Sequence, residues 1–229
     1  MSLLLNIDTA TEEAGVYLAE DGVVLSAAFN NRQMDHASWV HGAIELVLSQ
    51  NCKKIHDIDA VAVVSGPGSY TGLRVGLATA KGLCFALDKP LITLNTLYVM
   101  TASVLSQISR KGVDHSRQYF CPMIDARRME VFMALYTYEM KEIWSPRPMI
   151  LEANSFDTLD DAQEIIMFGS GAAKWKSLRT DNKFQYFEEK FTNEKMSLLS
   201  YEKYLAKDFA DLAYADPVYL KEFYTHQNK

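Results

Sequence analysis

Apolar runs separated by turn signals fill the first half of this chain and predict regular secondary structure. Helices are predicted at 36–50 and 70–87, where apolar residues recur three and four positions apart. Three strands followed by alternating helices and strands predict a mixed α/β lobe. The predicted strands are 2–8, 14–20, 23–30, 60–64 and 91–94.

The second half of the chain repeats this beginning. The apolar run 118–126 contains Ile124-Asp125, the first strand ends in Ile7-Asp8, and a second strand follows each pair. We therefore predict a duplicated protein whose two lobes, 1–110 and 111–229, meet at a cleft lined by the ends of their first strands. The crossing between the lobes is expected at 111–114, and the last helix is free to pack back on the first lobe.

Beyond the repeated strand the pattern weakens. Strands are predicted at 130–137, 142–150 and 164–168, and a helix at 197–209. Residues 180–195 are polar and aromatic without a clear period, so no element is assigned to them.

A glycine-rich stretch follows the strand at 60–64 and holds small residues at every fourth position. On a helix that spacing places them on one face, and each interior glycine costs ~1 kcal/mol relative to alanine. Such a stripe persists where a strand, a second helix or a partner protein approaches the helix closely. The loop matches neither a Walker A motif nor the dinucleotide fingerprint, so packing is favoured over phosphate binding. The small residues are Gly68, Gly72, Gly76, Ala80 and Cys84.

Composition narrows the function classes. The 229 residues are 48% hydrophobic and 23% charged, as in ordinary proteins with a buried core. No apolar run approaches the ~18 residues of a membrane span, so no membrane partner is expected. Three widely spaced cysteines favour reduced thiols and a cytoplasmic location. A net charge of −6 disfavours direct binding of nucleic acid by the chain alone.

The glycine-rich stretch also carries a family resemblance. Ser-Gly-Pro-Gly-Ser-Tyr-Thr-Gly-Leu-Arg-Val-Gly at 65–76 resembles the signature of the TsaB (YeaZ) family of bacterial proteins. Leu-Asn-Ile-Asp-Thr-Ala-Thr at 5–11 and Ile-Asp-Ala-Arg-Arg-Met-Glu-Val at 124–131 fit the same family. The resemblance is sharp up to about residue 132, and beyond it only Asp-Pro-Val-Tyr-Leu at 216–220 is similar.

The resemblance implies a duplicated actin-like/sugar-kinase fold of the ribonuclease H-like class, with two lobes. It implies a non-catalytic subunit of the tRNA N6-threonylcarbamoyladenosine (t6A) complex, which docks onto and activates a TsaD-type catalytic subunit alongside a TsaE-type ATPase subunit. It further implies a homodimer in isolation and no bound cofactor, and leaves ATP or ADP at the assembled interface open. The alternatives are an ATP-binding kinase or ATPase and, less favoured, a metallo-endopeptidase.

Two aspartates at equivalent strand ends are candidates for a vestigial nucleotide cleft. In kinases of the superfamily these strand ends face a nucleotide and its metal, which would assign Asp8, Thr9, Gly68 and Asp125 to cofactor binding. The alternative is that each aspartate only caps a turn through its side chain.

Metal chemistry and nucleophilic catalysis find no support in the sequence. The catalytic relative holds its metal through a His-x-x-x-His pair, and the corresponding stretch here, 95–100, has no histidine. His36 and His41 lie five apart, which places them on different faces of a helix. We expect no metal site, no catalytic residue and no hydrolase elbow.

Adjacent arginines after the second strand-end aspartate form a further candidate. The favoured interpretation is an intramolecular ion-pair set in which Arg127 and Arg128 join Glu130 to hold the lobes together. The alternative is that one of the arginines meets an anion or an acidic partner surface across the cleft.

The two helices of the first lobe supply a candidate partner surface. The apolar arc of the helix at 36–50 spans about 200°, wider than the ~100° that covering a sheet requires. Either the neighbouring helix covers the surplus or the two helices present it to another protein; the resemblance favours the second interpretation. The residues assigned to this surface are Trp39, Ala43, Leu46, Gly72, Gly76 and Ala80.

Overall fold

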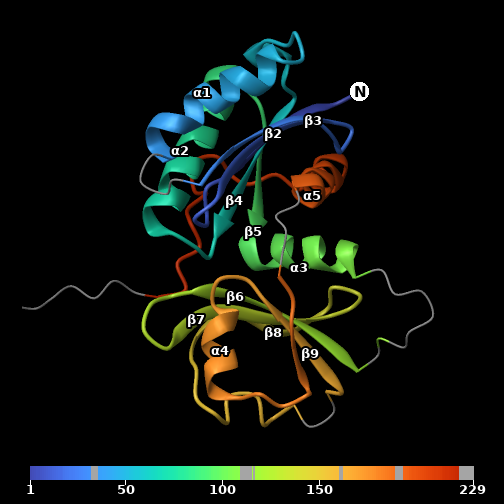
Figure 1. Ribbon diagram of the computed structural model, residues 1–229. Coiled ribbons are helices and arrows are strands. Elements are labelled where there is room, and N and C mark those ends of the chain that lie inside the picture. Colours follow the sequence, from blue (N-terminus) through green and yellow to red (C-terminus); the bar gives the residue numbers. More distant parts are fainter. Residues whose placement is uncertain (32–35, 109–114, 116, 160–161, 189–192, 222–229) are drawn as a thin grey trace, which may run out of the picture.

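Two five-stranded mixed sheets form two lobes, one above the other in Figure 1. The computed structural model describes residues 1–229 except 32–35, 109–114, 116, 160–161, 189–192 and 222–229. The first sheet contains β1 (Leu3–Asp8), β2 (Ala14–Glu20), β3 (Val23–Asn30), β4 (Ala60–Gly66) and β5 (Leu91–Asn95). The second contains β6 (Gln118–Asp125), β7 (Glu130–Thr137), β8 (Glu142–Ile150), β9 (Glu164–Phe168) and β10 (Phe184–Tyr186).

The two sheets have the same topology. The first runs in the order β3-β2-β1-β4-β5, and the second, read from its other edge, runs β8-β7-β6-β9-β10. In each, the first strand is antiparallel to the second and parallel to the fourth, as β1 is to β2 and β4 and as β6 is to β7 and β9. This repetition confirms the duplicated two-lobed α/β fold. The predicted crossing at 111–114 lies outside the described residues, and the division at residue 110 stays a prediction.

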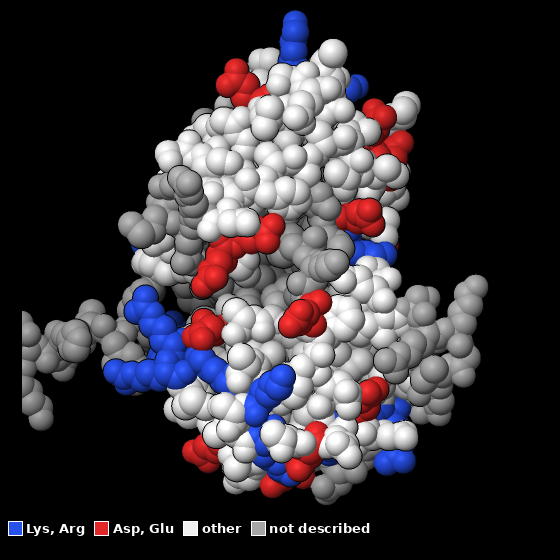
Figure 2. Space-filling view, viewed as in Figure 1, with Lys and Arg blue, Asp and Glu red and all other residues white. Residues whose placement is uncertain are grey.

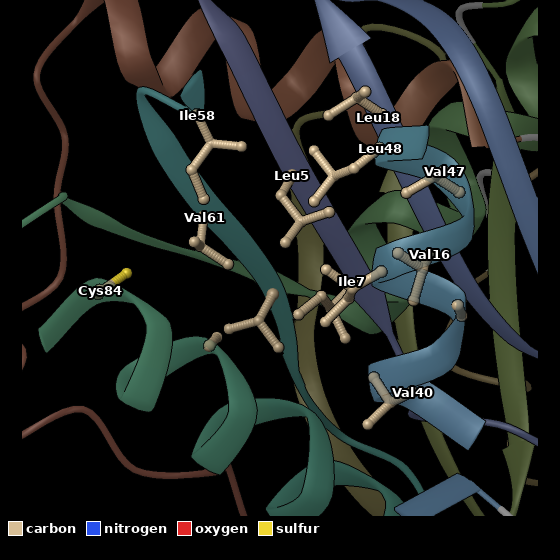
Figure 3. Packing of buried hydrophobic residues seen from close by; sticks show 14 of the residues in the cluster. Leu5, Ile7, Val16, Leu18, Val40, Val47, Leu48, Ile58, Val61 and Cys84 are labelled. Carbon is tan, nitrogen blue, oxygen red and sulfur yellow. The ribbon is translucent and has the colours of Figure 1, made fainter. Parts of the chain in front are cut away.

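Helices cover both faces of the first sheet. On one face α1 (His36–Ser49) packs on β2 and β3, while α2 (Tyr70–Leu87) packs mainly on β4. Leu5 and Ile7, alternate residues of β1, belong to one apolar cluster with Val40 and Val47 of α1, and Figure 3 shows Leu5 beside Leu48 and Ile7 beside Val16. A short 3-10 turn, η2 (Ile55–Asp57), leads from α1 into β4.

The other face of the first sheet is covered from both halves of the chain. There α3 (Thr96–Gln107) packs on β4 and β5, and α5 (Asn193–Leu205), which follows the second lobe in sequence, packs on β1, β2, β3 and β5 (Figure 1). The buried Asn6 amide oxygen accepts a hydrogen bond from the Ser200 hydroxyl at 2.5 Å, which ties α5 to β1. The last helix begins four residues before the predicted 197 and ends before the predicted 209.

The second lobe has two apolar cores because its central strands are buried on both faces. On β6, Cys121 and Met123 face one core, and Phe120 and Ile124 face the other. The first core is closed by α4 (Ala172–Leu178), whose Trp175 is fully buried, and the second by α3. Thus α3 contacts both lobes.

Four elements have no counterpart in the sequence prediction: the turn η2, the helices α3 and α4, and the strand β10. Helix α3 has a weak apolar period, and it begins where the Asn95 side chain accepts a hydrogen bond from the Tyr98 N–H at 3.1 Å. Strand β10 lies in the unassigned stretch 180–195 and pairs only with β9. No helix within the described ranges is long and apolar enough to cross a membrane.

Candidate functional site

The glycine stripe of α2 packs against the end of β1. A Cβ on Gly72 would lie 2.0 Å from the Thr9 carbonyl oxygen, and one on Gly76 would lie 2.3 Å from the Thr9 hydroxyl. The Thr9 hydroxyl donates a hydrogen bond to the Gly72 carbonyl at 2.7 Å. The packing role predicted for the stripe is confirmed, and its partner is the strand end of the same lobe.

This packing corrects part of the predicted partner surface. Gly72, Gly76 and Ala80 are buried on the inner face of α2, and Ala43 is buried on the inner face of α1. These four residues are therefore not part of the exposed surface of the chain, because they fill the space between the helices and the sheet.

Two backbone N–H groups of the glycine loop donate hydrogen bonds within the chain. The Ser69 N–H donates to the Ala10 carbonyl at 2.7 Å, and the Gly72 N–H donates to the Ser69 hydroxyl, which caps α2. A Cβ on Gly68 would lie 2.3 Å from the same Ala10 carbonyl oxygen. The space in which a helix N-terminus can hold a phosphate is thus occupied by the β1 turn.

The two strand-end aspartates differ in environment. Asp8 is 2% exposed, and its carboxylate accepts the Ala10 N–H at 2.9 Å in a turn within β1's own loop. Burial raises the pKa of Asp8 to about 6, against the lowering effect of that hydrogen bond, and Glu13 adds to the rise. A carboxyl group in this position favours its neutral form more than an ordinary aspartate does.

Asp125 is exposed and paired. Partial burial pushes its pKa upward, but the Lys174 ammonium at 2.7 Å and the Arg127 N–H at 2.6 Å outweigh that effect and hold the pKa below its usual value. Among the described residues no hydrogen bond or ion pair joins Asp125 to Asp8. Nucleotide binding by Asp8, Thr9, Gly68 and Asp125 stays a prediction.

The predicted ion-pair set of the adjacent arginines is wrong. Glu130 pairs with Lys221 at 2.5 Å, and its backbone carbonyl accepts from Lys174. The side chains of Arg127 and Arg128 are exposed and form no ion pair with any described residue. Lysines from α4 and from the last described residues therefore take the acidic partners that the arginines were expected to hold.

The outer faces of α1 and α2 carry exposed apolar residues beside open backbone. Phe85 of α2 is 83% exposed and Leu46 of α1 is 47% exposed. A Cβ on Gly42 of α1 or on Gly82 of α2 would meet nothing within 4 Å. Trp39, in contrast, is half-buried against the first-lobe core. Sequence reasoning found the helices but assigned the buried stripe of α2 rather than its outer face.

Similarity to known proteins decides the family. A family model described as "TsaD: tRNA N6-adenosine threonylcarbamoyltransferase" matches residues 23–219. The "tRNA threonylcarbamoyladenosine biosynthesis protein TsaB" of Escherichia coli is 33% identical over 141 residues, 62% of this chain and 58% of that protein. The protein of the same name from Bacillus subtilis is 26% identical over 167 residues, 72% of this chain and 69% of that protein. The chain belongs to the TsaD family as a TsaB (YeaZ) member.

Solved structures agree with this assignment in fold. "YeaZ from Pseudomonas aeruginosa" superposes with a TM-score of 0.78 at 23% identity, covering 96% of this chain and all of that one. The matched part spans only 58% of the E. coli TsaB, so the activity and partners of the whole protein are proposals.

The C-terminal segment 206–221 of this chain runs back along α2. Lys81 donates to the carbonyls of Ala213 and Ala215, and the Val218 N–H donates to the Ser65 carbonyl at 2.7 Å. The Arg74 side chain lies 3.9 Å from the Tyr70 ring centre. It also donates to the Tyr219 hydroxyl at 2.9 Å. Sequence reasoning missed this packing, and its only signal was the family-like stretch 216–220.

A cavity of about 520 Å³ opens between the lobes, where β5 and α3 approach α5 and the β7–β8 hairpin. Its walls carry two tyrosines, Tyr98 and Tyr136, and two glutamates, Glu142 and Glu202. Nothing in the sequence pattern predicted it, because its residues come from five separate elements. Within the described ranges no three His, Cys, Asp or Glu side chains are grouped as a metal site.

Proposed function

We propose that this chain is a non-catalytic subunit of the machinery that makes N6-threonylcarbamoyladenosine in tRNA. In this proposal it docks onto a TsaD-type catalytic subunit and activates it. The relatives named TsaB are described as proteins of that biosynthesis. A relative from Dictyoglomus turgidum, named "tRNA N6-adenosine threonylcarbamoyltransferase", is 32% identical over 111 residues, 42% of this chain and 33% of that protein. A catalytic subunit with a similar lobe can pair with this one through equivalent helices, as the two copies in a symmetric dimer do.

The observation that carries the proposal is the exposed outer face of α1 and α2. Phe85 presents 83% of its surface to solvent, with Leu46 on the neighbouring helix. Exposed apolar side chains that form one patch mark interaction surfaces, and the proposal places Phe85 and Leu46 in one such patch. Burying a phenylalanine side chain contributes roughly 1.5–3 kcal/mol. The open backbone at Gly42 and Gly82 lets a partner helix approach both helices closely.

The surroundings of Asp8 at the end of β1 also support a non-catalytic role for the chain. The Asp8 carboxyl is buried with a raised pKa, and two N–H donors of the glycine loop, those of Ser69 and Gly72, are used within the chain. In the proposed assembly the chain contributes a surface, while a TsaE-type ATPase subunit joins the complex and any nucleotide binds where the subunits meet. Without the catalytic subunit, the same face pairs with a second copy of the chain.

A charge placed on this face tests the proposal. The Phe85→Glu variant is expected to fold normally, because the side chain is on the surface, and to lose both self-association and binding to the catalytic subunit in analytical ultracentrifugation. In a reconstituted reaction it is expected to lose threonylcarbamoyl transfer to tRNA. Ile150→Glu is the matched control, since Ile150 is 66% exposed on β8 of the second lobe. Unchanged assembly of Phe85→Glu would contradict the proposed docking face.

A further inference from the structure

The turn between β6 and β7 presents two arginines on a constrained backbone. Arg127 and Arg128 have φ angles of 70° and 50°, in the left-handed region that bulky side chains rarely adopt. The turn is held by the Arg127 N–H bond to the Asp125 carboxylate and by the Glu130 N–H bond to the Arg127 carbonyl at 3.1 Å. Asparagine and glycine suit such a conformation better, so the arginines are not there for the turn itself.

Among the described residues, the carboxylates next to the turn in sequence pair with lysines and not with the two arginines. Lys174 neutralises Asp125 and Lys221 neutralises Glu130, so the nearest carboxylates are already paired. No described residue forms an ion pair with Arg127 or Arg128. Figure 2 shows Lys and Arg side chains gathered at one edge of the second lobe, in a chain whose net charge is −6.

The turn lacks an exposed apolar residue, and this indicates which kind of partner its arginines bind. Protein–protein interfaces bury an apolar centre, and the one large apolar residue of the turn, Met129, is partly buried against the second-lobe core. Contacts to a nucleic-acid backbone need only cations, and the guanidinium fork matches the oxygens of a phosphate. An RNA backbone therefore fits the turn better than an acidic protein surface does.

We propose that Arg127 and Arg128 contact phosphates of the tRNA backbone when the chain is assembled with its catalytic subunit. This inference rests on the proposed function, because the net charge of −6 disfavours RNA binding by the chain alone. Each phosphate that a protein neutralises adds ~0.7 to ~0.9 to the slope of log affinity against log salt concentration. Two contacts account for a slope of roughly 1.4–1.8.

Salt-dependent binding of an unmodified tRNA transcript to the purified complex tests this inference. In the variant, Arg127→Asn and Arg128→Gly remove both cations and relax the backbone of the turn, so that misfolding does not obscure the result. The slope is expected to fall by roughly 1.4–1.8. At low salt the variant complex is expected to bind RNA at least tenfold more weakly than the wild-type complex, with assembly unchanged. The control variant, Lys54→Ala with Lys141→Ala, removes two exposed cations elsewhere and is expected to keep the slope.

The outcomes separate the two proposals. If the complex assembles and the arginine variant keeps the salt slope, this inference is wrong and the proposed function stands. If the variant loses assembly instead of RNA binding, the turn meets an acidic protein surface and the inference is again overturned. If the wild-type chain does not assemble with the catalytic subunit at all, both proposals fall.

Discussion

Replacing Gly72 by alanine is expected to destabilise the protein, against the usual trend. In a helix interior the change from glycine to alanine gains ~1 kcal/mol, and less near the first turn where Gly72 lies. Here the new Cβ would lie 2.0 Å from the Thr9 carbonyl oxygen, an atom of the main chain that cannot rotate away. Overpacking of this kind costs ~1–3 kcal/mol. Loss of the Thr9 hydroxyl bond to the Gly72 carbonyl costs ~1 kcal/mol more. The net expectation is a loss of about 2 kcal/mol.

Urea unfolding, followed by circular dichroism, measures this effect. The free energies of unfolding are compared for variants whose dependence on urea concentration (the m value) is the same. Gly82→Ala and Gly42→Ala are matched controls, because both glycines are helical and their Cβ positions are open. Each control is expected to gain up to ~1 kcal/mol, so the sign reverses between Gly72 and the controls. If Gly72→Ala stabilised the protein as the controls do, the tight packing of α2 on the β1 turn would be refuted.

Three further predictions concern Asp8, the arginine turn and Ser200. The pKa of Asp8 in the folded state, about 6, lies above the ordinary value of 3.8. Protonated Asp8 therefore contributes its whole share of the stability below pH 3.8, and this share is lost as the pH rises through 6. Asp8→Asn should therefore raise the free energy of unfolding by up to roughly 3 kcal/mol near pH 7 and leave it unchanged at low pH in urea titrations. Changing Arg127 to Asn and Arg128 to Gly should stabilise the isolated chain by about 1–2 kcal/mol in thermal unfolding, and no gain would contradict the constrained turn. Ser200→Ala should cost about 1–3 kcal/mol, because it orphans a buried amide of β1. Ser197→Ala, at an equally buried hydroxyl with no partner, should be neutral or stabilising, and equal losses would refute the assignment.

The duplicated strand ends have diverged in their electrostatics. Asp8 is buried, and its pKa is raised, whereas Asp125 is exposed beside Lys174, and its pKa is lowered. The local sequences Ile7-Asp8 and Ile124-Asp125 are the same, so the difference comes from what each lobe packs over the strand end. The β1 turn is covered by α2 and the glycine loop, while the β6 end leads into an exposed arginine turn.

The sequence by itself determined the elements whose periodicity is strong. The strands at 14–20, 23–30, 130–137, 142–150 and 164–168 and the helix at 70–87 have the expected bounds. It also determined the duplication, since an apolar strand that ends in Ile-Asp begins each half. Helix α3 escaped prediction because both lobes bury it, which removes the polar face that a periodic signal requires.

The tertiary structure alone decided which faces are exposed and which charges pair. A stripe of glycines on α2 has the same spacing whether it meets a partner or a strand, and only the packing against Thr9 shows that it faces inward. Lys174 and Lys221 lie 44 and 91 residues from Glu130, yet they take the roles that neighbouring arginines were expected to fill. Local pattern encodes which residues are buried within one element, whereas contacts between distant elements depend on how the two lobes and the returning C-terminal segment pack together.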